Sequence, residues 1–371
     1  MVSTTQHERL VKAAKAIRHE FPLLRQHMWK LPLILGSLTW FLKDRYRFER
    51  EKSELDPAFF LKDHIIIALK TLYTLPLLFI APPCILTGLW LYDMHIRAPG
   101  IFPSFFCLPF KLCLDFLTYF LSTPEFEMRE DVSGEMKSVD HQDEEWYIVN
   151  GIVESPAMII ETARILHSWT GRPVTPLVNP SHGIGIDIME CIMGRTLDTN
   201  EAVVKGTAYK FKERILYGKK VVCICHSQGG IVVSNVVREL VRSVKAGDLK
   251  PEQLAQLEVY TFGSAADDFP GYKDESTGNV YPFVEHFAAQ NDIVGSIGAL
   301  TASGTLPAPV TSTGEYTNAN WNGNVYMLTH SLCQGHLMKE HLLPALRVGL
   351  FGQDSNLMKK YCSSGITRNR W

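Results

Sequence analysis

The chain has 371 residues, of which 46% are hydrophobic and 20% charged, a composition typical of a globular protein with room for one large domain and an appended region. Its formal net charge is -2, so it lacks the basic excess that binding to a nucleic-acid backbone requires. We therefore expect no nucleic-acid partner.

The first part of the chain, residues 1–121, is predicted to be a hydrophobic helical region that associates with a membrane. Residues 71–92 contain no charged side chain. As a helix they would reach about 33 Å, against about 30 Å for the hydrocarbon core of a bilayer. Prolines at positions 76, 82 and 83 favour a kink or a re-entrant hairpin over a straight span. A helical hairpin packed on the rest of the protein is the alternative interpretation.

Basic residues are concentrated on the N-terminal side of residues 71–92, which by the positive-inside rule places that flank in the cytosol. We expect a membrane-associated protein with a cytosolic catalytic domain. The side of the membrane on which this domain lies depends on the number of spans. Residues 122–144 are rich in Glu, Asp, Ser and Gly and predict a charged linker. A hydrolase domain is then expected over residues 145–350, followed by a tail at 351–371.

Strand and helix signals alternate within residues 145–350, a pattern typical of an α/β fold with a mostly parallel central sheet. Each expected helix has apolar residues at helical spacing, and glycines follow two of them. The predicted strands are residues 146–152, 173–179, 219–225, 257–262, 282–289 and 324–328, and the predicted helices are residues 156–170, 202–217 and 231–244.

Ser227 lies between a predicted buried strand and a predicted amphipathic helix, in the segment Cys-His-Ser-Gln-Gly. A serine in such a tight turn has its hydroxyl raised above the sheet, as in the G-x-S-x-G motif, although Cys225 replaces the first glycine here. The backbone N–H of Gln228 is expected to point at a developing oxyanion. A second donor is expected from the loop after the first strand, at the backbone N–H of Ile152. The alternative is that Ser227 is an ordinary turn residue.

Folds with this nucleophile turn place the acid and then the base further along the chain. Asp292 follows a predicted strand and is the expected acid, while His336 follows the last predicted strand and is the expected base. His336 would accept the proton of Ser227, and Asp292 would orient the imidazole. The sequence leaves open His330 and His341 as bases, and Asp267 and Asp268 as acids.

Other polar residues are assigned structural roles. His286 is interpreted as a hydrogen-bonded histidine within a strand, and His226 as a neighbour that packs beside the nucleophile turn. His182, Asp187 and Glu190 lie close together in the sequence, but they do not have the spacing of a metal site. We therefore expect no metal at these positions.

Four segments, VCICHSQGG, LEVYTFGSA, VEHFAAQNDIV and GHLMKEHLL, together resemble the lipase-like serine esterases of the α/β-hydrolase superfamily. Residues 146–195 also look like a fungal and algal branch of that superfamily whose members often carry hydrophobic N-terminal segments. The resemblance covers residues 144–350. It implies a hydrolase of ester or acyl bonds that uses Ser227, Asp292 and His336, with no metal and no organic cofactor.

The expected function is that of a membrane-attached esterase acting on a lipid or another acyl ester. One alternative is a catalytically silent membrane scaffold that retains the fold. The other is an acyltransferase that forms the same acyl-enzyme and passes the acyl group to an alcohol.

Overall fold

The computed structural model describes the α/β part of the chain and several short pieces outside it. The described residues are 141–306 without 153 and 198–200, 320–328, 355–361, and the pieces 20, 25–30, 65–73 without 67, 127–128, 132, 136, 336, 338 and 341–342. The predicted membrane segment therefore lies outside them, except for residues 71–73. Within the described ranges, we find no helix with both the length and the hydrophobicity needed to cross a bilayer.

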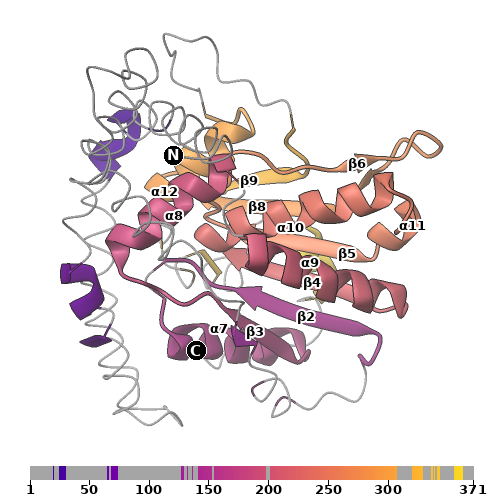
Figure 1. The fold of residues 1–371 in the computed structure, drawn as a ribbon, viewed down its shortest axis with the longest axis horizontal. Coiled ribbons are helices and arrows are strands. Elements are labelled where there is room, and N and C mark those ends of the chain that lie inside the picture. The colour runs from indigo at the N-terminus through magenta and orange to yellow at the C-terminus, as the bar shows by residue number, and fades with distance from the viewer. Residues whose placement is uncertain are drawn as a thin grey trace, which may run out of the picture.

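Seven strands form the central sheet, in the spatial order β1-β3-β2-β4-β5-β8-β9. All neighbouring pairs are parallel except β1 with β3, so the sheet is mostly parallel as predicted (Figure 1). Its strands are β1 (Glu127–Met128), β2 (Glu144–Val149), β3 (Val174–Val178), β4 (Lys220–His226), β5 (Leu257–Phe262), β8 (Phe283–Ala289) and β9 (Asn324–Leu328). β6 (Tyr272–Lys273) and β7 (Val280–Tyr281) form a separate antiparallel pair.

Helices form at the three predicted places, including α7 (Pro156–Thr170), and α8 (Ile184–Leu197) is a further helix that was not predicted. In α7, the Ser155 hydroxyl accepts a hydrogen bond from the Met158 N–H, and Gly171 ends the helix with a φ of 69°. The described helices are η1 (Met28–Lys30), α7 (Pro156–Thr170), α8 (Ile184–Leu197), α9 (Glu201–Leu216), α10 (Gln228–Lys245), α11 (Pro251–Leu254), α12 (Ile293–Gly295), the π-helical turn η3 (Ser296–Leu300) and α14 (Asn356–Tyr361).

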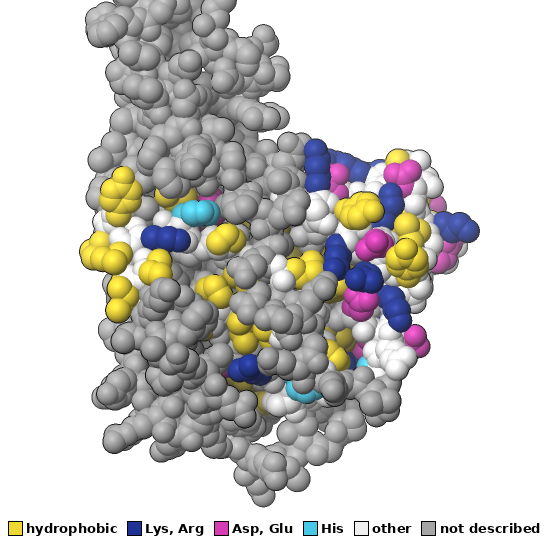
Figure 2. Space-filling model, turned by 60° about the horizontal axis from the view of Figure 1, so that its bottom comes forward, with side chains coloured by type: hydrophobic (Ala, Val, Ile, Leu, Met, Phe, Trp, Pro, Cys, Tyr) yellow, Lys and Arg dark blue, Asp and Glu magenta, His cyan; other side chains and the backbone are white. Residues whose placement is uncertain are grey.

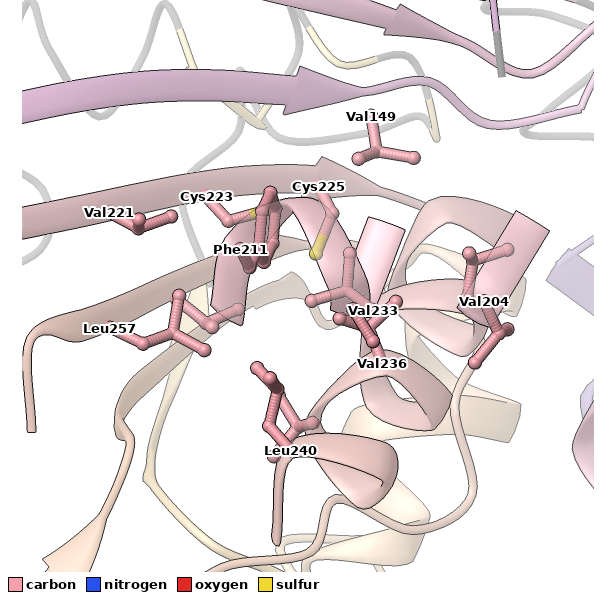
Figure 3. Close-up of a cluster of buried hydrophobic side chains, with 14 of the residues drawn as sticks. Val149, Val204, Phe211, Val221, Cys223, Cys225, Val233, Val236, Leu240 and Leu257 are labelled. Carbon is pink, nitrogen blue, oxygen red and sulfur yellow. The ribbon is translucent and has the colours of Figure 1, made fainter. Parts of the chain in front are cut away.

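Both faces of the sheet are covered, so the central strands are apolar on both sides. In β4, Val221, Cys223 and Cys225 face one core cluster, whereas Val222 and Ile224 face the other. The first cluster is closed by α9 and α10, and Figure 3 shows side chains of both helices against this face of β4. The second cluster is closed by α7 and by residues from the C-terminal part of the chain.

Described pieces outside residues 145–350 belong to this packed unit, among them Val132 and Met136 in the second core cluster. β1, within the segment predicted to be a linker, pairs with β3. α14, within the predicted tail, packs against the second cluster through Leu357 and Tyr361. The predicted boundaries at residues 121 and 350 lie outside the described residues, and the boundary at 144 falls on the first residue of β2. The division into domains stays a prediction.

A buried carboxylate of the sheet binds the first turn of α14. Glu285 in β8 is fully buried and accepts hydrogen bonds from the Ser355 hydroxyl (3.1 Å) and from the N–H groups of Asn356 (2.8 Å) and Leu357 (3.2 Å). The two N–H groups belong to the first turn of the helix and have no partner within it. The carboxylate therefore caps α14 and fixes it to the sheet.

We expect Glu285→Gln to destabilise the protein, because an amide has one acceptor oxygen where the carboxylate has two. Loss of a charged hydrogen bond at a buried site costs about 1–3 kcal/mol. The measurement is the denaturant midpoint, with the m-value unchanged. Glu252→Gln, at an exposed position of α11, is the control and is expected to change stability by less than about 0.5 kcal/mol. An unchanged midpoint for Glu285→Gln would contradict this account.

Candidate active site

The order of the strands places a switch point, where a ligand crevice is expected, beyond the carboxyl ends of β2 and β4. The connection after β2 leads to β3 on one side, whereas the connection after β4 leads to β5 on the other side. In open α/β sheets, ligands bind where the connections diverge in this way, beyond the carboxyl ends of the strands. Gly151 follows β2 and Ser227 follows β4, so both lie at this point.

Ser227 joins β4 directly to α10 in a strained conformation. Its φ of 54° and ψ of -119° make it the one non-glycine residue with positive φ among the described residues. Such a conformation costs about 1–3 kcal/mol and is found where the surroundings enforce it. Three main-chain hydrogen bonds do so here: Ser227 N–H to the Phe262 oxygen, and the Gly230 and Ala265 N–H groups to the Ser227 oxygen.

The glycines after Ser227 allow the helix to approach its neighbours. A Cβ atom at Gly230 would lie 2.1 Å from the Ser264 hydroxyl oxygen, and one at Gly229 would lie 2.8 Å from main-chain oxygens of β2 and its loop. Cys225, where the G-x-S-x-G motif has glycine, is buried in the first core cluster, against α10 (Figure 3). The turn therefore forms with a cysteine at this position.

The structure brings together the three residues expected to act as nucleophile, base and acid. His336 Nε2 lies 2.7 Å from Ser227 Oγ, and His336 Nδ1 lies 2.9 Å from Asp292 Oδ2. Asp292 also accepts hydrogen bonds from the N–H groups of Val294 and Gly295. These bonds hold the carboxylate in place at the N-terminus of α12, whose dipole favours a negative charge there.

The charges of this chain of hydrogen bonds follow from its environment. Burial alone would raise the pKa of Asp292, but the neighbouring His336 and His341 and their hydrogen bonds hold it well below its usual value. Burial lowers the pKa of His336, and the opposing effect of Asp292 does not fully restore it. At neutral pH an ionised Asp292 thus faces a neutral His336, whose free nitrogen can accept the Ser227 proton.

The sheet is mostly parallel and has a switch point at β2 and β4. A strained serine joins the strand before it to the helix after it. The chain has an α/β-hydrolase fold. This assignment rests on the strand order and on the turn at Ser227.

Comparisons with known proteins give weak similarities to esterases. No family model and no curated protein sequence matches the chain. Among solved structures it is similar to a Trichoderma reesei cutinase bound to a phosphonate inhibitor, with 12% identity over 57% of this chain and 87% of the cutinase, and a TM-score of 0.29. It is also similar to a thermostable esterase from Pseudomonas putida, with 9% identity over 58% of this chain and 72% of the esterase, and a TM-score of 0.33. A Pyrobaculum calidifontis esterase has 10% identity over 59% of this chain and 81% of its own, with a TM-score of 0.28.

One expected oxyanion donor, Gln228, directly follows Ser227, and the other, Ile152, belongs to the loop after β2. Gln228 is the first residue of α10, and N–H groups of a first helical turn have no partner within the helix. The loop after β2 touches the serine, because a Cβ at Gly151 would lie 2.6 Å from Ser227 Cβ. The Gly151 N–H donates to Glu154 at 2.6 Å. The N–H of Ile152 is therefore the next donor along this loop, and its role stays a prediction.

A buried polar network fixes the same region from the side of β3. Asn150 and Asn179 exchange hydrogen bonds of 2.6 and 2.9 Å, and the Asn179 amide donates to Gln228 Oε1 at 2.7 Å. Gln228 in turn donates to Glu190 at 3.1 Å. The Gln228 side chain is thus held by Asn179, which follows β3, and by Glu190 in α8.

The alternative acids and bases have other places in the structure. Asp267 lies 3.8 Å from Arg195, and Asp268 pairs with Arg238. His341 is fully buried, with Nε2 3.4 Å from Asp292 Oδ2, so it faces the acid rather than the serine. His330 lies outside the described residues.

His286 and His226 both have partners, and those of His226 were not expected. His286 hydrogen bonds with Thr261 and with the Asn322 main-chain oxygen, and burial lowers its pKa to about 4. It is a hydrogen-bonded strand histidine, as interpreted from the sequence. His226 contacts both Glu154 and the main chain of His336. Glu154 was missed because nothing in its spacing indicates that it contacts the nucleophile loop.

Two groups in the described part of the chain are compact enough to be considered as metal ligands. In the first, His226, His336 and His341, each imidazole faces a protein oxygen of a carboxylate, a carbonyl or a hydroxyl. In the second, His182 lies 3.3 Å from Glu190, whereas both Asp187 oxygens accept hydrogen bonds from residues 181 and 182, just before α8. Asp187 is thus engaged by hydrogen bonds, whereas His182 Nδ1 and Glu190 Oε1 have no hydrogen-bond partner among the described residues.

We expect Gly151→Ala to lower the reactivity of Ser227, because the added methyl group would overlap the serine side chain. A displacement of about 1 Å at a reacting group can cost about 100-fold in rate. The measurement is the rate of labelling by a fluorophosphonate. Gly206→Ala is the control, since a Cβ there has no neighbour within 4 Å and alanine favours the helix. Equal labelling of the two variants would contradict the expectation.

Proposed function

We propose that the protein is a serine hydrolase that cleaves an ester or acyl bond through an acyl-enzyme on Ser227. The observation that carries this proposal is the hydrogen-bonded chain from the Ser227 hydroxyl through His336 to the buried Asp292 carboxylate. A nucleophile, a base and a group that orients the base form the arrangement that activates a serine for acyl transfer.

In the proposed reaction, His336 Nε2 takes the proton of Ser227 as Oγ attacks the carbonyl carbon. The negative charge that forms on the carbonyl oxygen is stabilised by the backbone N–H groups of Gln228 and Ile152. His336 then gives the proton to the leaving alcohol, and the acyl group remains on Ser227. A water molecule, deprotonated by His336, attacks this ester, releases the acid and restores the serine.

We further propose that the substrate is a lipid or another apolar acyl ester, and that the N-terminal region attaches the enzyme to a membrane with its catalytic domain in the cytosol. The sequence support is the uncharged stretch at residues 71–92. Described N-terminal pieces also contact loops at the carboxyl ends of the strands: Lys30 donates to the Gln290 oxygen and Lys70 to the Ser181 oxygen.

Exposed apolar side chains support an apolar partner for these N-terminal pieces. On the face shown in Figure 2, hydrophobic side chains gather mainly on the left and in the middle, and most charged side chains lie on the right. Exposed apolar patches mark protein or membrane contacts. Residues 65–73 and η1 contribute the exposed side chains of Trp29, Ile65, Ile66, Leu69, Leu72 and Tyr73.

Ser227→Ala is expected to abolish hydrolysis of an aryl ester, because no other group supplies the nucleophile in the proposed reaction. Loss of a serine nucleophile lowers kcat by about 10⁶-fold in a well-studied serine protease. The measurements are ester turnover and fluorophosphonate labelling. Ser168→Ala, at an exposed position of α7, is the matched control. Full turnover by Ser227→Ala would reject the proposal, and a folded wild-type protein without labelling would favour the silent scaffold.

The pH dependence of kcat/KM should report the protonation of His336. The base must be neutral to accept a proton, so activity is low below its pKa and rises as the pH increases through it. Because burial lowers the pKa of His336, we expect the midpoint of the acidic limb below about 6.5, the usual value for histidine. The measurement is initial rate against pH with a substrate that does not ionise. A midpoint above about 7 would contradict the charge assignment.

A further inference from the structure

We propose that Glu154 and His226 act as a positioning pair that fixes the loop after β2 and the main chain of His336 relative to Ser227. The inference rests on the proposed function and deepens it, because it assigns a role to two buried residues that the reaction itself does not use. Neither residue touches the reacting atoms in the proposed reaction, so both act through the groups that they hold.

Glu154 fixes the loop that touches the nucleophile. Its carboxylate is almost completely buried, and Oε2 accepts the Gly151 N–H at 2.6 Å. The Gly151 backbone lies so close to Ser227 that a Cβ there would come within 2.6 Å of the serine Cβ. By engaging this N–H, the carboxylate determines how the following peptide, with the N–H of Ile152, is presented to the crevice.

His226 connects this carboxylate to the base. It is the last residue of β4, directly before the nucleophile. Its Nδ1 lies 3.4 Å from Glu154 Oε2, and its Nε2 lies 2.6 Å from the main-chain oxygen of His336. The two imidazole rings are stacked, with centroids 4.8 Å apart and an angle of 29° between their planes. The imidazole of His226 therefore links Glu154, in the loop after β2, to the main chain of the base His336.

The contacts of His226 favour its positively charged form. Both ring nitrogens face oxygen atoms that only accept hydrogen bonds, and only an imidazolium donates from both nitrogens. Burial alone would lower the pKa of His226, but Glu154 and the His336 oxygen raise it above its usual value. Burial alone would raise the pKa of Glu154, yet His226 and the Gly151 N–H bring it below its usual value. The pair is thus a buried ion pair.

The charged groups around His336 make this pair relevant to the reaction. His336 faces the Asp292 carboxylate, the imidazoles of His226 and His341, and, at longer range, the Glu154 carboxylate. The positive charge on His226 lowers the pKa of His336, whereas Asp292 raises it. His226 therefore favours the neutral form of the base as well as holding its main chain.

Stability alone does not explain a buried ion pair at this position. Taking two charges out of water costs several kcal/mol, and replacing such pairs by apolar residues is often neutral or stabilising. A pair that fixes the geometry of a reacting group raises the reaction rate, since small displacements of such a group lower the rate strongly.

The test uses Glu154→Gln, His226→Gln and the double variant in the full-length protein, with an aryl ester as the substrate. Each single substitution is expected to lower kcat by about 10- to 100-fold and to change KM by less than about 3-fold, since substrate binding is not affected. Because the two residues act together, the kcat of the double variant should be no lower than that of the less active single variant. Glu144→Gln is the matched control: its carboxylate pairs with Arg172 at the other end of β2, and its kcat should not change.

The acidic limb of the pH profile separates positioning from a general loss of structure. Removal of the positive charge in His226→Gln raises the pKa of His336, so the limb should move to higher pH. If this folded variant keeps kcat within about 2-fold of the wild type, or loses kcat while the limb stays in place, the inference is rejected. Both results leave the proposed function intact, because the Ser227→Ala experiment tests it separately.

Glu154→Asp provides a second variant should the glutamine variants not fold. It retains the charge that pairs with His226 but shortens the reach to the Gly151 N–H by one methylene group. We expect a lower kcat with an unchanged acidic limb, because the loop moves while the charge on His226 remains. Wild-type kcat in this variant would overturn the role of Glu154.

Discussion

Ser227 is held in a backbone conformation that few residues other than glycine adopt, and most features of the site depend on this constraint. The main-chain hydrogen bonds from β5 and its following loop hold the residue in place, and Gly229 and Gly230 let α10 approach β2 and Ser264 closely. As a result, Oγ projects above the sheet, and the first N–H groups of α10 remain without partners within the helix. Strain at one residue thus places a nucleophile and a candidate oxyanion donor side by side.

The remaining groups reach this point from distant parts of the chain, and buried carboxylates hold them there. Asp292 is fixed by the N-terminus of α12 and orients His336, while Glu154 fixes the loop after β2 and faces His226. Each carboxylate thus has an imidazole and a main-chain N–H as partners. Such pairing makes burial of the charges tolerable in a dry site, where an unpaired charge would be very costly.

The same end of the sheet also contacts the described pieces of the N-terminal region. Lys30 donates to the Gln290 oxygen and to the Ser296 hydroxyl, close to Asp292 along the chain, and Lys70 contacts the loop before α8. The neighbouring apolar side chains are exposed. The proposed attachment of this region to a membrane rests on the sequence and on these exposed side chains.

The sequence by itself determined the order of the six longer strands of the sheet and of α7, α9 and α10, because strand and helix periodicity, proline and glycine signals and the strand–serine–helix pattern are local properties. It did not predict β1 or α8. It predicted Ser227, Asp292 and His336 as nucleophile, acid and base, since this fold arranges the three in a known order along the chain, but it left other acids and bases open. Only the tertiary structure separated His336 from His341, which both face Asp292. Likewise, only the folded chain showed that Glu154 meets His226 and that α14 is capped by Glu285, because these contacts join residues that are far apart in sequence and leave no spacing pattern.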